Sequence, residues 1–188
     1  FVDRFEELDL KIHGVRLPEF EIDARHKREA GASDSVGNYD FLRTVCLNGF
    51  KKLSLKKNTK EYKKYVERTR HELSIIKELG FTDYMLLVWD VINFCKESDI
   101  PIGLGRGSAA GSLVLFLMGV TGIDPIKYDL YFERFISKIR AKKQVVDGVT
   151  YLDGSLMCDI DLDICYYNRP RVLGYLEDKF AGKTSKIV

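Results

Sequence analysis

The chain has 188 residues, of which 45% are hydrophobic and 31% are charged, with 30 Lys and Arg against 28 Asp and Glu. This length is enough to bury a core in one domain or at most two small ones, and the composition excludes general disorder. The net charge of +2 identifies no partner, so any nucleic-acid signal must come from local clusters of basic residues.

The four cysteines and three histidines form no metal or disulfide pattern. The chain has no Cys-x-x-Cys pair, and its histidines lie far from the cysteines, which argues against a zinc site. We therefore expect reduced thiols in a cytoplasmic protein. The longest apolar run, 113–120, is too short to cross a membrane. Because the chain opens without Met and ends without an obvious stop, we expect it to be a piece of a longer protein.

The first half of the chain is predicted to be helical after an irregular start. Residues 1–38 are expected to be a linker from a preceding domain. Helical spacing predicts a short helix over 39–49 and a longer one over 62–79 that ends at Gly80. A further amphipathic helix, capped by Asp83, is expected to follow.

Residues 51–70 carry nine Lys and Arg against two Glu. Two interpretations stay open: a solvated helix face, or a surface that contacts the phosphates of a nucleic acid. The candidate phosphate contacts are Lys56, Lys57, Lys60, Lys63 and Lys64.

The second half mixes strands and helices without a regular alternation, which predicts an α+β fold. The expected elements are a strand at 100–102, an apolar helix over 109–118, a helix over 128–136, an inserted hairpin at about 143–153 with its turn at Asp147-Gly148, a strand over 156–164, and a helix that opens at Pro170.

Three aspartates alternate with apolar residues near the end of this predicted strand. Alternation places Asp159, Asp161 and Asp163 on one face, with neighbouring carboxylates roughly 6–7 Å apart. Such a row repels itself unless a cation lies between its members, and hard oxygen ligands suit Mg²⁺ or Mn²⁺. Two such ions can serve phosphoryl transfer. The alternatives are an acidic, solvent-facing strand and a Ca²⁺ site, although the loop spacing of an EF-hand is missing.

A glycine-rich segment over 103–112 follows the short strand and leads into the apolar helix. Its glycines let backbone N–H groups approach an anion, while Arg106 offers a positive fork and Ser108 and Ser112 offer hydroxyls. The segment is neither a Walker A loop nor a dinucleotide fingerprint. It is either a tight turn of small residues or, together with the acidic strand, a site for a metal-bound nucleoside triphosphate.

At these residues the sequence resembles family C DNA polymerases, the catalytic alpha subunit of bacterial DNA polymerase III and its relatives. The resemblance covers most of residues 40–180 in the right order. The matching text is Gly105 to Ser112, Gly122 to Pro125, Phe132 to Phe135, and Asp159 to Asp163.

The resemblance implies a palm of the polymerase beta-like nucleotidyltransferase type, a mixed β-sheet backed by helices. It places the first part of this palm at 39–168 and the start of a thumb at 169–188. It assigns the two catalytic metals, Mg²⁺ or Mn²⁺, to Asp159 and Asp161. It also assigns contacts with the nucleotide to Gly107 and Ser108, with Arg106, Ser112, Asp163 and Arg134 as supporting residues.

The activity implied by the resemblance is template-directed DNA synthesis on primer-template DNA with dNTP substrates. The sliding clamp and other replisome proteins would bind through regions outside this chain. The family usually has Pro where Cys158 stands and a shorter loop before the acidic segment, which suggests a divergent, phage-encoded branch in a bacterial cell. No part of the chain matches the family's third catalytic aspartate, so we expect the fragment alone to be inactive.

Two other functions stay open. One is a nucleotidyltransferase that adds nucleotides without a template. The other is a catalytically inactive module that serves DNA binding or assembly.

Overall fold

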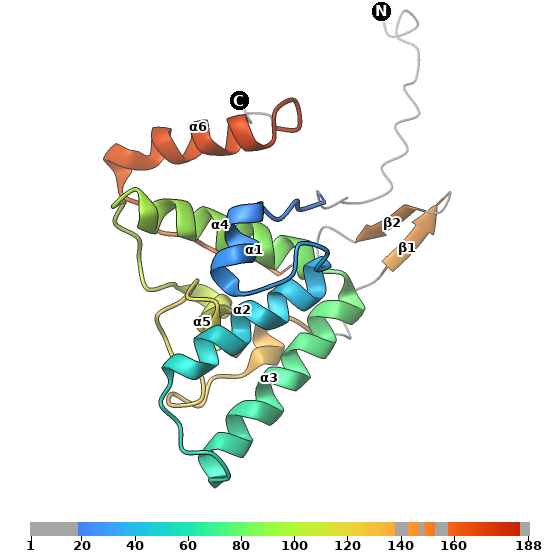
Figure 1. Cartoon of the computed structure of the whole chain (residues 1–188), viewed down its shortest axis with the longest axis vertical. Coiled ribbons are helices and arrows are strands. Elements are labelled where there is room, and N and C mark those ends of the chain that lie inside the picture. The colour runs from blue at the N-terminus through green and yellow to red at the C-terminus, as the bar shows by residue number, and fades with distance from the viewer. Residues whose placement is uncertain (1–18, 138–142, 147–148, 153–157, 185–188) are drawn as a thin grey trace, which may run out of the picture.

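The computed structural model describes residues 19–137, 143–146, 149–152 and 158–184. Over these ranges the chain forms helices and one β-hairpin (Figure 1). The elements are α1 (Ala24–Ala30), α2 (Asn38–Lys52), α3 (Lys60–Leu79), α4 (Thr82–Glu97), α5 (Leu113–Leu117), β1 (Lys143–Val146), β2 (Val149–Leu152) and α6 (Arg169–Lys179).

The predicted α+β fold, a polymerase beta-like palm with a mixed β-sheet backed by helices, is wrong. Within the described ranges, the only sheet is the antiparallel pair β1–β2, and a single isolated bridge joins Ile102 to Ile164. The strand expected over 156–164 is an extended segment from residue 158 onward that forms no ladder. Aspartate is a poor strand former. In the part of the chain that the structure describes, residues 101–103 are the only ones that exchange backbone hydrogen bonds with this segment.

The strand pairing expected of the hairpin at about 143–153 is present in the backbone. Strands β1 and β2 pair antiparallel, with Val146 opposite Val149. The Asp147-Gly148 turn itself lies outside the described residues.

The helices of the first half are confirmed. The predicted helix over 62–79 is α3, which begins after Thr59 and ends at Gly80. The Thr59 side chain accepts a hydrogen bond from the Tyr62 amide at 3.1 Å, which satisfies one of the free amides of the first turn. Gly80 has φ = 78°, the left-handed conformation that glycine adopts at helix ends.

The apolar helix expected over 109–118 is divided in two. A 3₁₀ turn, η2 (Gly107–Gly111), precedes the five-residue α5, and Ser112 between them is extended. Glycine is a weak helix former and Ser112 caps α5, so both favour the break. The helix expected over 128–136 is reduced to the 3₁₀ turn η3 (Phe132–Arg134), because Asp129 takes a positive φ of 50°.

Two details at the start of the chain also differ from expectation. Helix α1 lies in the stretch expected to be irregular. Asp83 does not cap α4; its carboxylate accepts hydrogen bonds from the Phe20 amide and from Asn38 Nδ2 at 3.1 and 2.9 Å. Asp83 therefore ties the N-terminal segment and the start of α2 to α4.

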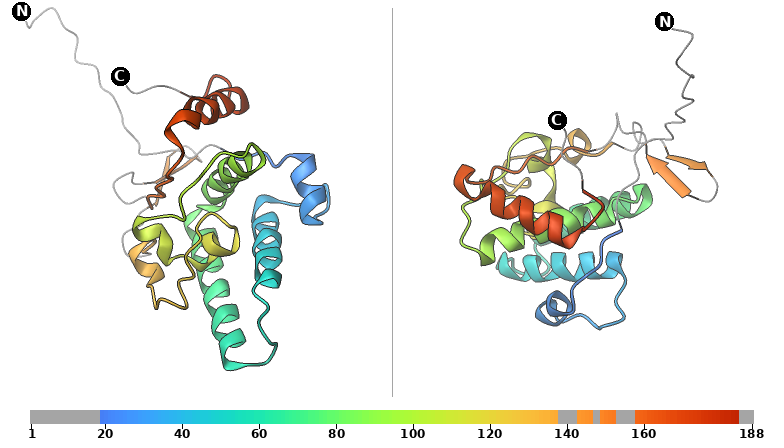
Figure 2. Two further views of the ribbon diagram at one scale, coloured as in Figure 1. Left: turned by 90° about the vertical axis from the view of Figure 1, so that its left-hand side faces the viewer. Right: turned by 90° about the horizontal axis from the view of Figure 1, so that it is seen from above.

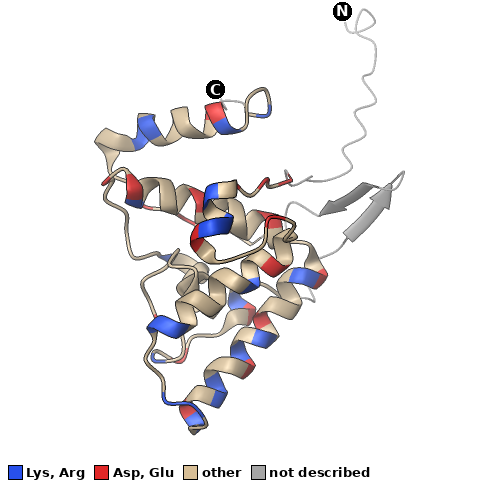
Figure 3. Ribbon diagram, in the orientation of Figure 1, with Lys and Arg blue, Asp and Glu red and all other residues tan. Residues whose placement is uncertain are grey.

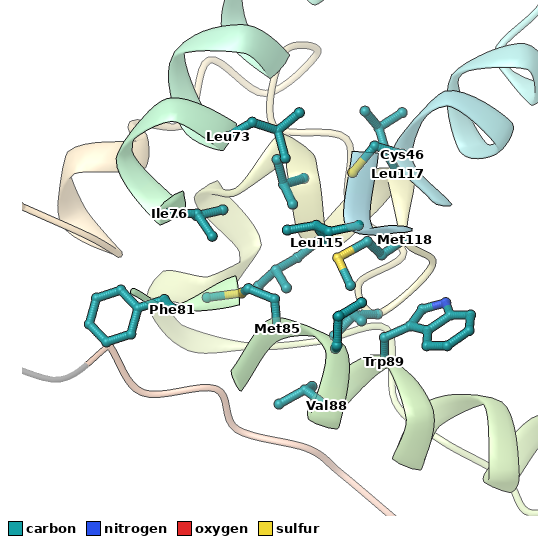
Figure 4. Packing of buried hydrophobic residues seen from close by; sticks show 14 of the residues in the cluster. Cys46, Leu73, Ile76, Phe81, Met85, Val88, Trp89, Leu115, Leu117 and Met118 are labelled. Carbon is teal, nitrogen blue, oxygen red and sulfur yellow. The ribbon is translucent and has the colours of Figure 1, made fainter. Parts of the chain in front are cut away.

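The core lies where α2, α3 and α4 surround α5 (Figure 4). Leu115 of α5 is fully buried among side chains of the three longer helices, including Leu73 and Met85. The close approach of α2 and α5 requires Gly49, since a Cβ there would lie 1.9 Å from the Leu117 carbonyl oxygen. This core fixes the start of α5, and with it the end of the glycine-rich segment.

Helix α6 packs on α4 (Figure 2). Buried Asp90 of α4 accepts hydrogen bonds from Lys179 Nζ and the Tyr175 hydroxyl at 2.7 and 2.6 Å, and the Tyr175 ring stacks on Phe94. None of the helices in the described part of the chain has the length and apolarity needed to cross a bilayer.

Candidate nucleotide and metal site

The glycine-rich segment and the acidic segment lie directly against each other. The Gly103 amide donates to the Asp163 carbonyl oxygen at 2.8 Å, and the Cys165 amide donates to the Pro101 carbonyl oxygen at 3.0 Å. A Cβ at Gly103 would lie 2.9 Å from the Asp163 Cβ. Two motifs that are far apart in the sequence therefore form one site.

Arg106 joins the two motifs electrostatically. Its Nη1 lies 3.2 Å from Asp161 Oδ2, and its Nε lies 3.1 Å from Asp163 Oδ1. The guanidinium thus holds both carboxylates around one positive charge. All three side chains are partly exposed, so these ion pairs contribute little to stability and can exchange for other charged partners.

Aspartate oxygens are the kind of ligand that a divalent cation takes. The two carboxylates that converge on one positive group are Asp161 and Asp163, whereas the predicted ligand pair is Asp159 and Asp161. The three aspartates do not form a compact ligand set. Within the described ranges, the sets of three candidate ligand atoms that lie within 4.8 Å of one another are Asp23, His26 and Asp90, and His26, Glu29 and Glu97. Asp159 is exposed, outside the contact that Arg106 makes.

Tyr84 of α4 lies next to the acidic segment. The helical pattern of α4 predicts Tyr84 as a core residue and does not link it to the site. Burial raises the pKa of Tyr84 to about 12, and the charges of Cys158, Asp159 and Asp161 add to the rise. A hydrogen bond with the Ile160 backbone opposes it. The Tyr84 hydroxyl is therefore neutral at neutral pH, and it contacts the backbone of the acidic segment at Ile160.

The conformation of the loop depends on glycine next to the aspartates. Gly107 has φ = 66°, and a Cβ there would lie 3.3 Å from Asp161 Oδ2. Gly107 and Ser108 are both exposed, so both are accessible to a ligand. Because η2 is a short 3₁₀ turn, the helix dipole expected at this position is lost. Anion binding here would depend on Arg106 and on backbone and hydroxyl donors.

Ser112 lies away from this exposed surface. Its side chain is fully buried, donates to Glu72 Oε2 at 2.9 Å, and accepts from the Leu115 amide at 3.3 Å. The predicted contact between Ser112 and a nucleotide is therefore replaced by a structural one.

The sequence model of a protein family, the bacterial DNA polymerase III alpha NTPase domain, matches residues 40–188. The chain belongs to this family. DNA polymerase III subunit alpha of Aquifex aeolicus is 39% identical over 75% of the chain, that of Ureaplasma parvum 40% over 79%, and that of Staphylococcus aureus 37% over 92%. The resemblance inferred from the motifs is thereby confirmed.

The chain spans only 11%, 14% and 13% of the length of these three relatives. It therefore corresponds to a short part of a DNA polymerase III alpha chain. The relatives are bacterial, so the expectation of a phage origin stays a prediction.

An ion pair between partly buried Arg68 and fully buried Glu72 holds the far end of the glycine-rich loop. Glu72 accepts hydrogen bonds from Arg68 Nε at 2.6 Å, from Ser112, and from the first two backbone amides of α5. Arg68 also donates to the carbonyl oxygens of Gly111 and Leu130 at 2.9 and 3.0 Å. Burial raises the pKa of Glu72, and these donors oppose the rise.

Sequence reasoning missed this pair, although a signal was present. Glu72 adjoins Leu73 in the apolar stripe of α3, and Arg68 precedes it by four residues. A charged residue inside an apolar stripe, with an opposite charge one turn away, indicates a buried pair.

The remaining predicted residues are exposed and separate from the loop contacts. Arg134 is exposed at the end of η3. The five candidate phosphate-contact lysines are exposed around the start of α3, where Figure 3 shows basic residues gathered.

Proposed function

We propose that the chain supplies metal- and nucleotide-binding residues of a replicative DNA polymerase that extends a primer on a DNA template. The observation that carries this proposal is the direct contact of the glycine-rich loop with the aspartate segment, bridged by Arg106. Membership in the polymerase III alpha family supports the reaction class.

Asp159 and Asp161 are the residues that would hold two Mg²⁺ ions. When bound, such ions neutralise charge on the triphosphate and favour attack by the hydroxyl. Gly107 lies beside Asp161, and together with Ser108 it would offer a backbone amide and a hydroxyl to the phosphate oxygens. Arg106 exchanges its carboxylate contacts for the triphosphate, and Asp163 holds its guanidinium in place before the nucleotide arrives.

The reaction forms a bond between the primer 3′ oxygen and the α-phosphorus of the dNTP. The bond from that phosphorus to the bridging oxygen breaks, pyrophosphate leaves, and the hydroxyl proton passes to solvent. The protein contributes position and charge, which is what phosphoryl transfer requires.

The primer-template DNA would meet the exposed lysines at the start of α3, whose charges suit a phosphate backbone. The sliding clamp and the other replisome proteins would contact parts of the polymerase outside this chain.

The substitution Asp161→Asn in the parent polymerase tests the metal assignment. Removal of one metal-binding carboxylate is expected to lower dNTP incorporation by roughly 10³-fold, since metal ions supply several kcal/mol of charge stabilisation. DNA affinity is expected to stay within about twofold. The measurements are primer extension and fluorescence anisotropy with a labelled primer-template.

Asp163→Asn is the matched control, because it removes a contact of Arg106 but no proposed metal ligand. It is expected to reduce incorporation by about tenfold or less. A rate of dNTP incorporation by Asp161→Asn equal to that of wild type would contradict the metal assignment. Extension that does not need a template would support the template-independent enzyme, and no incorporation by the wild-type parent would support the inactive module.

A further inference from the structure

Two adjacent tyrosines are almost fully exposed immediately after the acidic segment. Tyr166 and Tyr167 lie in the 3₁₀ turn η5 (Tyr166–Asn168) and are 81% and 88% exposed. Their ring centroids are 5.8 Å apart at an interplanar angle of 78°, so the rings contact each other at an edge. No residue in the described part of the chain covers either ring. Large aromatic side chains left in water in this way commonly serve as contact surfaces.

On the side of α6, the charge next to the tyrosines is positive. Arg169 and Arg171 are exposed in the first turn of α6, and the sequence from 164 to 176 contains no acidic residue. Arg171 Nη1 lies 3.3 Å from Asn168 Oδ1, and no carboxylate of the described ranges pairs with either arginine. The start of a helix adds a partial positive charge of its own. The surface therefore combines aromatic faces with unpaired cations.

This surface is attached to the candidate site. The Cys165 amide donates a backbone hydrogen bond to the Pro101 carbonyl oxygen, and a β-bridge joins Ile102 to Ile164. These contacts hold η5 beside the residues that lead into the glycine-rich loop. A nucleic acid that reaches Asp161 would pass close to η5.

We propose that Tyr166 and Tyr167 form a stacking surface for unpaired bases of a DNA strand, with Arg169 and Arg171 contacting its phosphates. Every base has a face that stacks on an aromatic ring, and arginine adds attraction to the backbone. A protein partner is the weaker alternative, since Leu173 is the one exposed aliphatic side chain of α6 nearby and two unpaired cations would have to be desolvated. The proposal deepens the proposed function and rests on it.

The test uses the 188-residue chain, a fluorescein-labelled oligo(dT) of twelve nucleotides, and an abasic strand of the same length, in buffer with EDTA. The wild-type chain is expected to bind oligo(dT) more tightly than the abasic strand by fluorescence anisotropy. The double substitution Tyr166→Ala and Tyr167→Ala is expected to weaken oligo(dT) binding by at least about tenfold and to leave abasic binding unchanged. Replacement of both tyrosines by Phe is expected to retain wild-type affinity, since stacking needs the ring and not the hydroxyl.

Tyr128→Ala is the matched control, because Tyr128 is also an exposed tyrosine but lies outside η5; its oligo(dT) affinity is expected to equal that of wild type. Unchanged affinity of the double alanine variant would overturn the proposal, as would equal wild-type affinity for the two strands. A loss of self-association in sedimentation without a loss of oligo(dT) binding would assign the surface to a second copy instead. The assay contains no metal and no incorporation step, so its failure and the failure of the Asp161 experiment are distinguishable.

Discussion

Glu72 is the residue on which the loop's far end depends most directly. Its carboxylate is fully buried and accepts from Arg68, Ser112 and two backbone amides. A buried charge with this many donors cannot lose its acceptor atoms without leaving several donors unpaired.

Glu72→Gln is expected to lower the free energy of unfolding by about 3 kcal/mol. The amide replaces one acceptor oxygen with donors that face other donors, and it leaves Arg68 without its ionic partner. Urea denaturation followed by circular dichroism measures the change. Glu67→Gln on the same helix is the control, since Glu67 is exposed, and a Glu72 variant within about 0.5 kcal/mol of wild type would contradict the assigned role.

For single residues, the residue type predicts the kind of chemical group at the site better than it predicts whether that group is exposed. The alternation of the aspartates and the positive charge in the glycine-rich loop point to Asp161, Asp163 and Arg106, and the structure brings these three residues together. Ser112 was expected at a ligand but is buried as a helix cap. A hydroxyl can cap a helix or bind a phosphate equally well, and only the position of the core decides between these uses.

Helix α6 is held against α4 by hydrogen bonds to one buried carboxylate, that of Asp90. Asp90 is buried and binds both Lys179 and Tyr175. Burial and the hydrogen bond to Asp90 raise the pKa of Tyr175 to about 12. Because the folded state favours the neutral phenol, this contact stabilises the fold fully below pH about 10, the unfolded pKa of tyrosine, and the stabilisation is lost as the pH rises through about 12.

The expected result is a stability difference between wild type and Tyr175→Phe that is present at pH 9 and shrinks by pH 11.5. Urea midpoints at the two pH values measure it, and the Phe variant accounts for the titration of the other tyrosines and lysines. A difference that stays constant between the two pH values would show that Tyr175 does not ionise in this range or does not contribute through its hydroxyl.

Elements with a strong helical period were predicted well, and the strand was not. Helix α3 follows from apolar spacing, a threonine cap and a terminal glycine, all of which are local. The alternation over 156–164 equally predicted a strand, but a strand needs a neighbour to complete its hydrogen bonds. Residues 101–103 supply only a short contact, and the segment remains extended.

For the whole molecule, the acidic segment offers too few converging carboxylates for a tight metal site. Asp161 and Asp163 share Arg106, Asp159 lies apart from that contact, and the family's third catalytic aspartate is expected outside the chain. Ligand number and charge set the affinity of such sites.

We therefore expect the 188-residue chain to bind Mn²⁺ weakly, with a dissociation constant on the order of a millimolar, and to extend no primer. Electron paramagnetic resonance of free Mn²⁺ measures the binding, and Asp161→Asn is expected to weaken it further. Primer extension by the isolated chain, or submicromolar Mn²⁺ affinity, would contradict this expectation.

The helices of the first half, the strand pairing of the hairpin, and the presence of an acidic motif and a glycine-rich motif follow from local spacing and residue chemistry. The contact of the two motifs through Arg106, the burial of Ser112 and the failure of the aspartate segment to join a sheet follow from the three-dimensional fold. Those outcomes depend on contacts between segments far apart in the chain, such as Glu72 with the start of α5 and Gly103 with Asp163. Local patterns carry no information about which distant partner will be available to complete them.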